Sequence, residues 1–177
     1  YRFSDGEQSL SGTGYTQLDK GWYDKESSSG MIYSMGVSDD LHYMLTGAKV
    51  GTSSIEMWGG RYISKDHDLI FYPTFNNLTV KREYDSCAGY LKVEMRKLRY
   101  KMVMEARSAL SDFYSQAFPS VIIFGGEQKY MKSMKAAATF TLYQGDELAE
   151  VIQMPQVLLE FSGPFYCDEM PPLQPDA

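Results

Sequence analysis

The chain has 177 residues, of which 44% are hydrophobic and 23% charged, and its formal net charge at pH 7 is −6. This length suits one well-buried domain and is short for two. The net negative charge argues against sequence-independent binding of nucleic acid, because the field of the whole molecule repels phosphates. No run of about 20 apolar residues occurs, so no transmembrane segment is expected.

Tyrosine and methionine are unusually abundant, with 14 Tyr and 11 Met. Tyrosine combines a large contact area with a polar tip and is typical of wet interfaces and half-exposed sheet faces. Methionine fills irregular gaps in cores and on adaptable surfaces. A copper site is not expected, because Met131 and Met134, which have the M-x-x-M spacing, have no His or Cys beside them.

Residues 1–30 are rich in Ser, Gly and acidic residues, with few apolar residues apart from aromatics such as Trp22 and Tyr23. We interpret this segment as an extended arm whose aromatic side chains attach it to a surface, and the alternative is a mobile terminus. Residues 31–167 are expected to form a single globular domain. The Pro-rich residues 168–177 are expected to be an extended tail.

From Met31 the hydrophobic pattern has a period of two, which predicts strands. Residues 31–37 and 41–45 alternate on either side of Ser38–Asp40, and this indicates a hairpin. Short strands are expected at 54–58, 61–64, 68–72 and 78–82, and turns at Gly59–Gly60 and at 66–68.

Residues 88–118 contain no proline and hold six basic residues against three acidic ones. Their apolar residues step by three and four, which predicts one long helix over about 91–117: Leu91, Met95, Leu98, Met102, Ala106, Ala109, Phe113 and Ala117. A mostly basic ridge follows the same steps: Lys92, Arg96, Arg99, Val103 and Arg107. Because residues 91–96 also alternate, a strand remains the alternative for the first turns.

Strands are expected again at 120–124, 136–143, 147–153 and 156–161, with a turn at 144–146 and Pro155 separating the last two. The predicted fold class is therefore α+β. A curved antiparallel sheet or sandwich-like β structure would pack on the long mid-chain helix, and the ridge would face outward or toward the acidic arm.

Two cysteines, Cys87 and Cys167, lie 80 residues apart. They can pair as a disulfide or remain as two buried thiols, and the Tyr-rich acidic composition favours the disulfide in an exported protein.

The sequence contains no recognisable catalytic motif, and His42 and His67 are its two histidines. Asp39 could orient His42 as a general base, with Asp68 assisting, but acidic residues are also ordinary in hairpin turns. Asp66 and Asp68 offer oxygens to a calcium ion without the other ligands of a calcium loop. No metal and no cofactor are expected.

The function that these observations favour is a non-catalytic protein-interaction or assembly module that is extracytoplasmic and oligomeric. A domain that binds a small apolar ligand or a glycan is the second hypothesis, and a hydrolase-type enzyme using Asp39 and His42 is the third. Trp58 beside a double glycine fits a binding patch or a core anchor. The expected partner contacts are Trp22, Tyr23, Trp58, Arg61, Lys92, Arg96 and Arg99.

Overall fold

The computed structural model describes residues 2–4, 6–13, 28–50, 54–72, 78–118 and 128–170. Within them the chain forms strands and two 3₁₀ turns but no α-helix. None of the described segments is a helix long and apolar enough to cross a membrane. The strands are β1 (Arg2–Ser4), β2 (Ser9–Ser11), β3 (Ser28–Val37), β4 (Leu41–Val50), β5 (Glu56–Ser64), β6 (Asp68–Phe71), β7 (Thr79–Asp85), β8 (Tyr90–Lys97), β9 (Tyr100–Arg107), β10 (Tyr114–Phe118), β11 (Gln128–Gln144) and β12 (Glu147–Ser162), and the 3₁₀ turns are η1 (Leu110–Asp112) and η2 (Gly163–Phe165).

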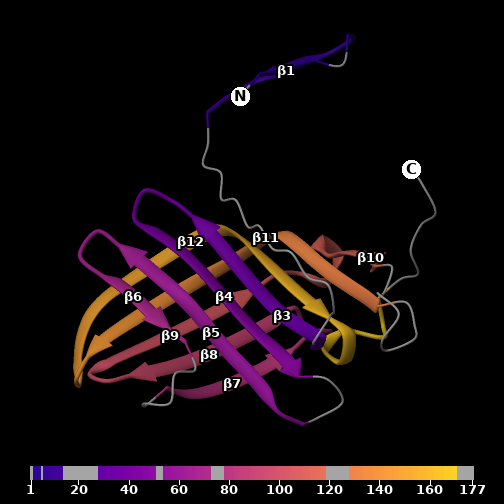
Figure 1. Cartoon of the computed structure of the whole chain (residues 1–177). Coiled ribbons are helices and arrows are strands. Elements are labelled where there is room, and N and C mark those ends of the chain that lie inside the picture. Colours follow the sequence, from indigo (N-terminus) through magenta and orange to yellow (C-terminus); the bar gives the residue numbers. More distant parts are fainter. Residues whose placement is uncertain are drawn as a thin grey trace.

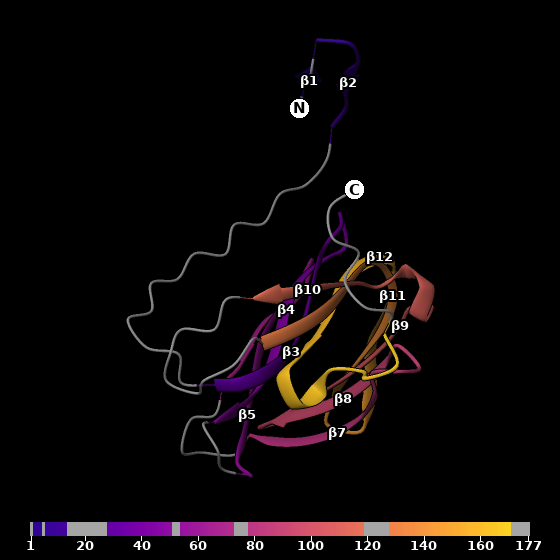
Figure 2. The ribbon, with the colours of Figure 1, turned by 90° about the vertical axis from the view of Figure 1, so that its right-hand side faces the viewer.

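One antiparallel sheet contains all strands from β3 onward, in the order β6-β5-β4-β3-β12-β11-β9-β8-β7, with β10 paired to β11. The pairing of β12 with β3 joins the early strands to the late strands in one sheet. The two margins of this sheet are then β6 and β7, which are consecutive in the chain. The sheet curls into a half-barrel that brings these margins toward each other (Figures 1 and 2). Side chains join them: Arg82 donates to Glu56, and Lys97 Nζ donates to the carbonyl of Ile70 at 2.8 Å.

The segment predicted as a long helix is two strands, a 3₁₀ turn and a third strand, so the α+β class is wrong and the fold is all-β. On β8, Leu91 and Val93 point inward and are buried, whereas Lys92 and Glu94 point to the other side of the strand. The same alternation continues on β9. Steps of four residues fit a helix but also keep a strand on one face, which is why the apolar stripe was misleading. Leu98, a member of that stripe, lies in the β8–β9 turn and is 78% exposed.

Two predicted breaks lie inside strands. Gly59–Gly60 does not turn the chain but belongs to β5, where a Cβ on Gly60 would meet the Met44 carbonyl oxygen at 2.7 Å. Pro155 does not separate two strands but lies within β12. The register shifts there, since Ala136 pairs with Val157 and Ala138 with Met154, and such a bulge tolerates a residue without an N–H.

Other expectations from the sequence are confirmed. The hairpin at 31–45 is β3–β4, and the turn at 144–146 joins β11 to β12. Strands also occur at the predicted sites of β6 and β7. The predicted strand at 120–124 lies outside the described residues.

The concave side of the sheet holds the hydrophobic core. Its largest fully buried side chains come from both halves of the sheet: Tyr62, Phe71, Phe140, Phe161, Ile32, Leu41, Leu45, Leu91, Met95, Met104, Met131 and Leu142. Inward positions of strands far apart in sequence therefore pack against each other, as in a sandwich folded from one sheet.

The chain after β12 closes one end of the curled sheet (Figure 2). Cys167 is bonded to Cys87 of the β7–β8 turn, with an S–S distance of 2.03 Å, so the sulfurs are paired. The ring of Phe165 packs edge-on against Tyr84 of β7, with centroids 5.4 Å apart. Closing a loop of 80 residues stabilises the fold by roughly 4–5 kcal/mol in the chain-entropy model.

The N-terminal segment, interpreted as an arm of residues 1–30, is described only in part. Residues 2–4 and 9–11 pair as the β1–β2 hairpin, which lies away from the large sheet in Figure 1. The large sheet begins at Ser28, and residues 14–27 lie outside the described residues, as do residues 171–177 of the expected tail.

Candidate interaction surface

The inside of the curled sheet is filled by aromatic side chains. Tyr43 and Tyr62 both pack against Phe140, with ring centroids 4.4 and 5.9 Å away. Ser34 Oγ donates to the Leu158 carbonyl at 2.7 Å, so Tyr43 donates to Ser34 Oγ, also at 2.7 Å. Burial raises the pKa of the Tyr43 phenol, which keeps it protonated for this role. The packed interior thus stabilises the fold, and the outer surface is the part that is available for functional contacts.

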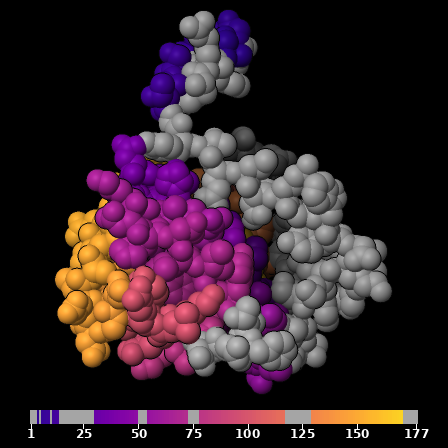
Figure 3. All heavy atoms as spheres, turned by 60° about the vertical axis from the view of Figure 1, so that its left-hand side comes forward, coloured from indigo at the N-terminus to yellow at the C-terminus, as the bar shows by residue number. Residues whose placement is uncertain are grey.

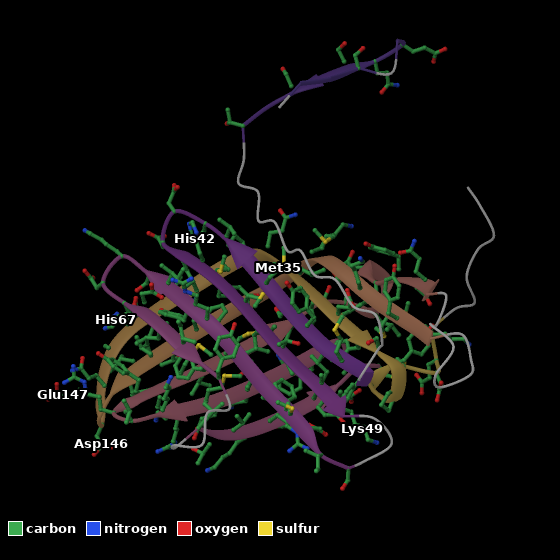
Figure 4. All side chains as sticks on the ribbon, viewed as in Figure 1. Met35, His42, Lys49, His67, Asp146 and Glu147 are labelled. Atoms are coloured by element: carbon green, nitrogen blue, oxygen red, sulfur yellow. A yellow bond between two sulfur atoms is a disulfide. The ribbon has the colours of Figure 1, made fainter. Side chains whose placement is uncertain are left out.

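The densest polar cluster joins the β5–β6 turn to β12, at the end of the sheet where Figure 4 labels His67, Asp146 and Glu147. Glu150 Oε1 accepts from Ser64 Oγ at 2.6 Å and lies 3.0 Å from His67 Nδ1. A serine nucleophile must give its proton to a base such as imidazole. Here Ser64 donates to the carboxylate instead, so the three groups act as a clasp between two elements.

Tyr62 lies next to this clasp and is fully buried. Its hydroxyl has no hydrogen-bond partner within the described part of the chain. Burial, and after it the charge of Glu150, raise the pKa of the phenol. Glu150 and Ser64 of the clasp therefore lie close enough to the phenol to influence its pKa.

The residues proposed for a hydrolase are exposed, and one of them is held in an ion pair. Asp39 is exposed in the β3–β4 turn, and His42 is exposed on β4. Asp68 accepts two hydrogen bonds from Arg61, at 3.0 and 2.8 Å. Arg61 holds the pKa of Asp68 below its ordinary value, which makes the carboxylate a poor proton acceptor.

The convex side of β3–β6 carries an apolar outer face. Its side chains, from paired strands, are Met31, Tyr33, Met35, Met44, Thr46, Ala48, Met57, Gly59 and Ile70, with Tyr72 following β6. The cross-strand register explains their grouping: Met35 pairs with Met44, Met44 with Arg61, and Arg61 with Ile70. Met57 is 50% exposed, Tyr72 46% and Ile70 42%. In Figure 3, β5 and β6 form a continuous surface toward the viewer.

This face carries almost no free charge. The 33 residues of β3–β6 include four charged residues: Lys49, Glu56, Arg61 and Asp68. Arg61 is paired with Asp68, while Glu56 accepts from Arg82 and from the indole of Trp58. The 23 residues of β7–β9 include eleven charged ones, so the two halves of the convex surface differ sharply.

The basic ridge of the sequence lies on the β8–β9 hairpin, and its partners come from the same hairpin. Lys92 and Arg107 both approach Glu105, at 3.8 and 3.2 Å, and Arg96 pairs with Glu94 at 2.7 Å. The positive charge is therefore partly neutralised within the hairpin, without the N-terminal arm. A depression of about 490 Å³ lies between this hairpin and Ala137, Thr139 and Thr141 of β11.

The expected partner contacts are thus distributed over several places. Trp58 is only 4% exposed and packs over Gly47 in the core, while Arg61 lies on the apolar outer face. Lys92 and Arg96 share the exposed side of β8, and Arg99 is in the β8–β9 turn. Trp22 and Tyr23 lie outside the described residues.

Sequence reasoning missed the side chains that make the apolar outer face, in particular Met44, Met57 and Ile70. The signal was present in residues 31–37, where Met and Tyr alternate with Ile and Ser. Without knowledge of how this strand pairs with its neighbours, however, the side that carries Met and Tyr is interpreted as the side facing the core. In the structure Ile32 and Ser34 face inward, and the Met and Tyr side faces out.

Metal chemistry finds little support in the described ranges. The one group of metal-binding side chains found there is Cys87, Cys167 and Glu169, and both of its sulfurs are consumed by the disulfide. Comparisons with protein-family models, with curated proteins and with solved structures return no significant match.

Proposed function

We propose that the protein is a non-catalytic interaction module that docks another protein chain on the apolar outer face of β3–β6. The observation that carries this proposal is the exposure of Met57, Ile70 and Tyr72 on a surface where, among the described residues, the outward charged side chains Arg61 and Asp68 neutralise each other. A sheet whose concave side is already packed has no structural need for a second apolar face. Contiguous exposed apolar surface of this kind is characteristic of interaction sites.

The chemistry of the face selects the kind of partner. Methionine and tyrosine dominate protein interfaces because they offer adaptable apolar contact and a polar tip. The outward cation among the described residues of this face, Arg61, is paired with Asp68, which makes the face a poor site for a phosphate or a lipid headgroup. Its partner is therefore a protein surface that is itself apolar and low in charge. The Cys87–Cys167 disulfide supports an extracytoplasmic setting for this contact, since disulfides persist in oxidising compartments.

A photo-reactive amino acid at position 57 tests this function. On the full-length protein in an extract of its source, it is expected to crosslink to a protein, whereas the same group at Leu148, which is 59% exposed on β12, is not. Ala48→Lys, which places a charge directly opposite position 57, should abolish the crosslink and change the free energy of unfolding by less than about 0.5 kcal/mol.

Two outcomes would overturn the proposal. Equal crosslinking from positions 57 and 148 would mean that the face has no specific partner. A loss of several kcal/mol of stability in Ala48→Lys would mean that the chain itself covers the face.

A further inference from the structure

Among the described residues, the β7 strand is a sheet margin that pairs with another strand on one side alone. It pairs along its full length with β8 and ends the strand order. Six of its seven residues are exposed, and it forms the lower margin of the sheet in Figure 1. An exposed strand edge presents backbone N–H and C=O groups that can pair with another strand.

Two charged side chains of opposite sign lie on the outer side of β7. Lys81 is opposite Glu94 of β8 and lowers the pKa of that carboxyl, and Glu83 is opposite Lys92 of β8. Arg82, on the other side of β7, is held by Glu56, and Tyr84 packs against Phe165. The edge therefore presents one positive and one negative side chain two residues apart.

We propose that β7 pairs with β7 of a second copy of this chain, antiparallel and centred on Arg82. A two-fold axis perpendicular to the sheet makes each residue contact its counterpart reciprocally. In this register Lys81 of each copy lies opposite Glu83 of the other, and Val80 lies opposite Tyr84. Each of the two charge pairs gives Lys81 or Glu83 an opposite charge on the open edge of β7, in addition to the one that it faces on β8.

Neighbouring registers are less complementary. A shift of the centre to Lys81 places two lysines against each other, and a shift to Glu83 opposes two glutamates and pairs fewer residues. Like charges directly opposite destabilise a strand pair. The central register opposes two arginines, but each is neutralised by its own Glu56.

This pairing is independent of the apolar outer face, because it uses the edge of the sheet and not its convex surface. It joins two curled sheets into one continuous sheet. Contact through a single strand edge is smaller than a standard interface, so the dimer is expected to dissociate in the micromolar range or weaker.

Charge reversals test the register on the full-length protein by sedimentation equilibrium at low salt. Lys81→Glu and Glu83→Lys are each expected to weaken dimerisation about tenfold or more, because each places like charges opposite one another twice. The double variant Lys81→Glu/Glu83→Lys restores both attractive pairs and is expected to dimerise like the wild type. An equimolar mixture of the two single variants is expected to form the heterodimer, in which every opposing pair attracts.

Control reversals at exposed positions away from β7, Lys65→Glu and Glu147→Lys, are expected to leave dimerisation unchanged. A wild type that stays monomeric at the highest concentration would overturn the inference, and so would a mixture that associates no better than its components. Either result leaves the crosslinking test at position 57 unaffected, so failure here is distinguishable from failure of the proposed function.

Discussion

Two glutamates on the large sheet show how position decides the effect of one carboxylate. Glu56 receives a hydrogen bond from Arg82, and this interaction holds its pKa below the ordinary value. Glu160 on β12 lies 4.0 Å from Lys132, but burial dominates and raises its pKa. The first carboxylate therefore stabilises the fold when ionised, and the second costs stability when ionised.

These opposite shifts predict opposite mutational effects at neutral pH. Glu56→Gln is expected to lower the free energy of unfolding at pH 7 by about 1 kcal/mol, because a charged hydrogen bond across the sheet margins is lost. Glu160→Gln is expected to leave it unchanged or raise it by about 0.5 kcal/mol, because a half-buried charge is removed.

The pH dependence of the two variants follows from the signs. The contribution of Glu56 is present above its unfolded pKa and is lost as the pH falls through its lower folded pKa. The cost of Glu160 appears as the pH rises from its unfolded pKa to its higher folded pKa. Urea unfolding at pH 7 and at about pH 3 should show both differences shrinking in acid, with Glu147→Gln as an exposed control. A loss of stability in Glu160→Gln at pH 7 would show that its pairing with Lys132 outweighs burial.

At the scale of elements, the β8–β9 hairpin shows what the sequence could and could not predict. The alternation of residues 91–96 correctly indicates a strand. The competing helical spacing of apolar residues continues into β9 only because the length of the hairpin turn keeps that spacing in phase. That turn contains Leu98 with φ of 54°, a left-handed conformation that nothing in its residue type suggests. The hydrophobic period alone could not distinguish a helix from two strands, because only the position of the turn separates these two structures.

Leu98 also provides a test of this hairpin. A leucine in the left-handed region costs about 1 kcal/mol relative to glycine, and its exposed side chain contributes little burial. Leu98→Gly is therefore expected to raise the free energy of unfolding by about 0.5–1 kcal/mol in denaturant titration. In a helix the same change would lower stability by about 1 kcal/mol, so the sign distinguishes the two folds. Leu148→Gly, an exposed leucine within β12, serves as the control and is expected to destabilise.

Strand positions were more predictable than strand partners. The β3–β4 hairpin and the β11–β12 turn follow from local alternation and from Gly, Asp and Ser at the turns. The pairing of β3 with β12 joins residues more than a hundred positions apart, and no local pattern encodes it. The candidate site depends on that pairing, because the register decides which side of β3 faces the core.

At the scale of the whole molecule, the curled sheet separates structural and functional surfaces. The concave side is packed, the disulfide-linked segment after β12 closes one end, and the convex side divides into a charged half and an apolar half. The clustered basic charge of residues 88–118 is neutralised in part by Glu94 and Glu105. The apolar half over β3–β6 is the feature that these arrangements leave without a structural role.

Methionine oxidation by dilute peroxide tests most directly whether this apolar outer face is open. The chain carries its own references, because Met57 is half exposed while Met95 and Met104 are fully buried. We expect Met57 in dilute native protein to oxidise at a rate close to that of an unfolded control, at least tenfold faster than Met95 and Met104. Protection of Met57 equal to that of Met104 in dilute protein would show that the chain covers its own face, and would contradict the proposed function.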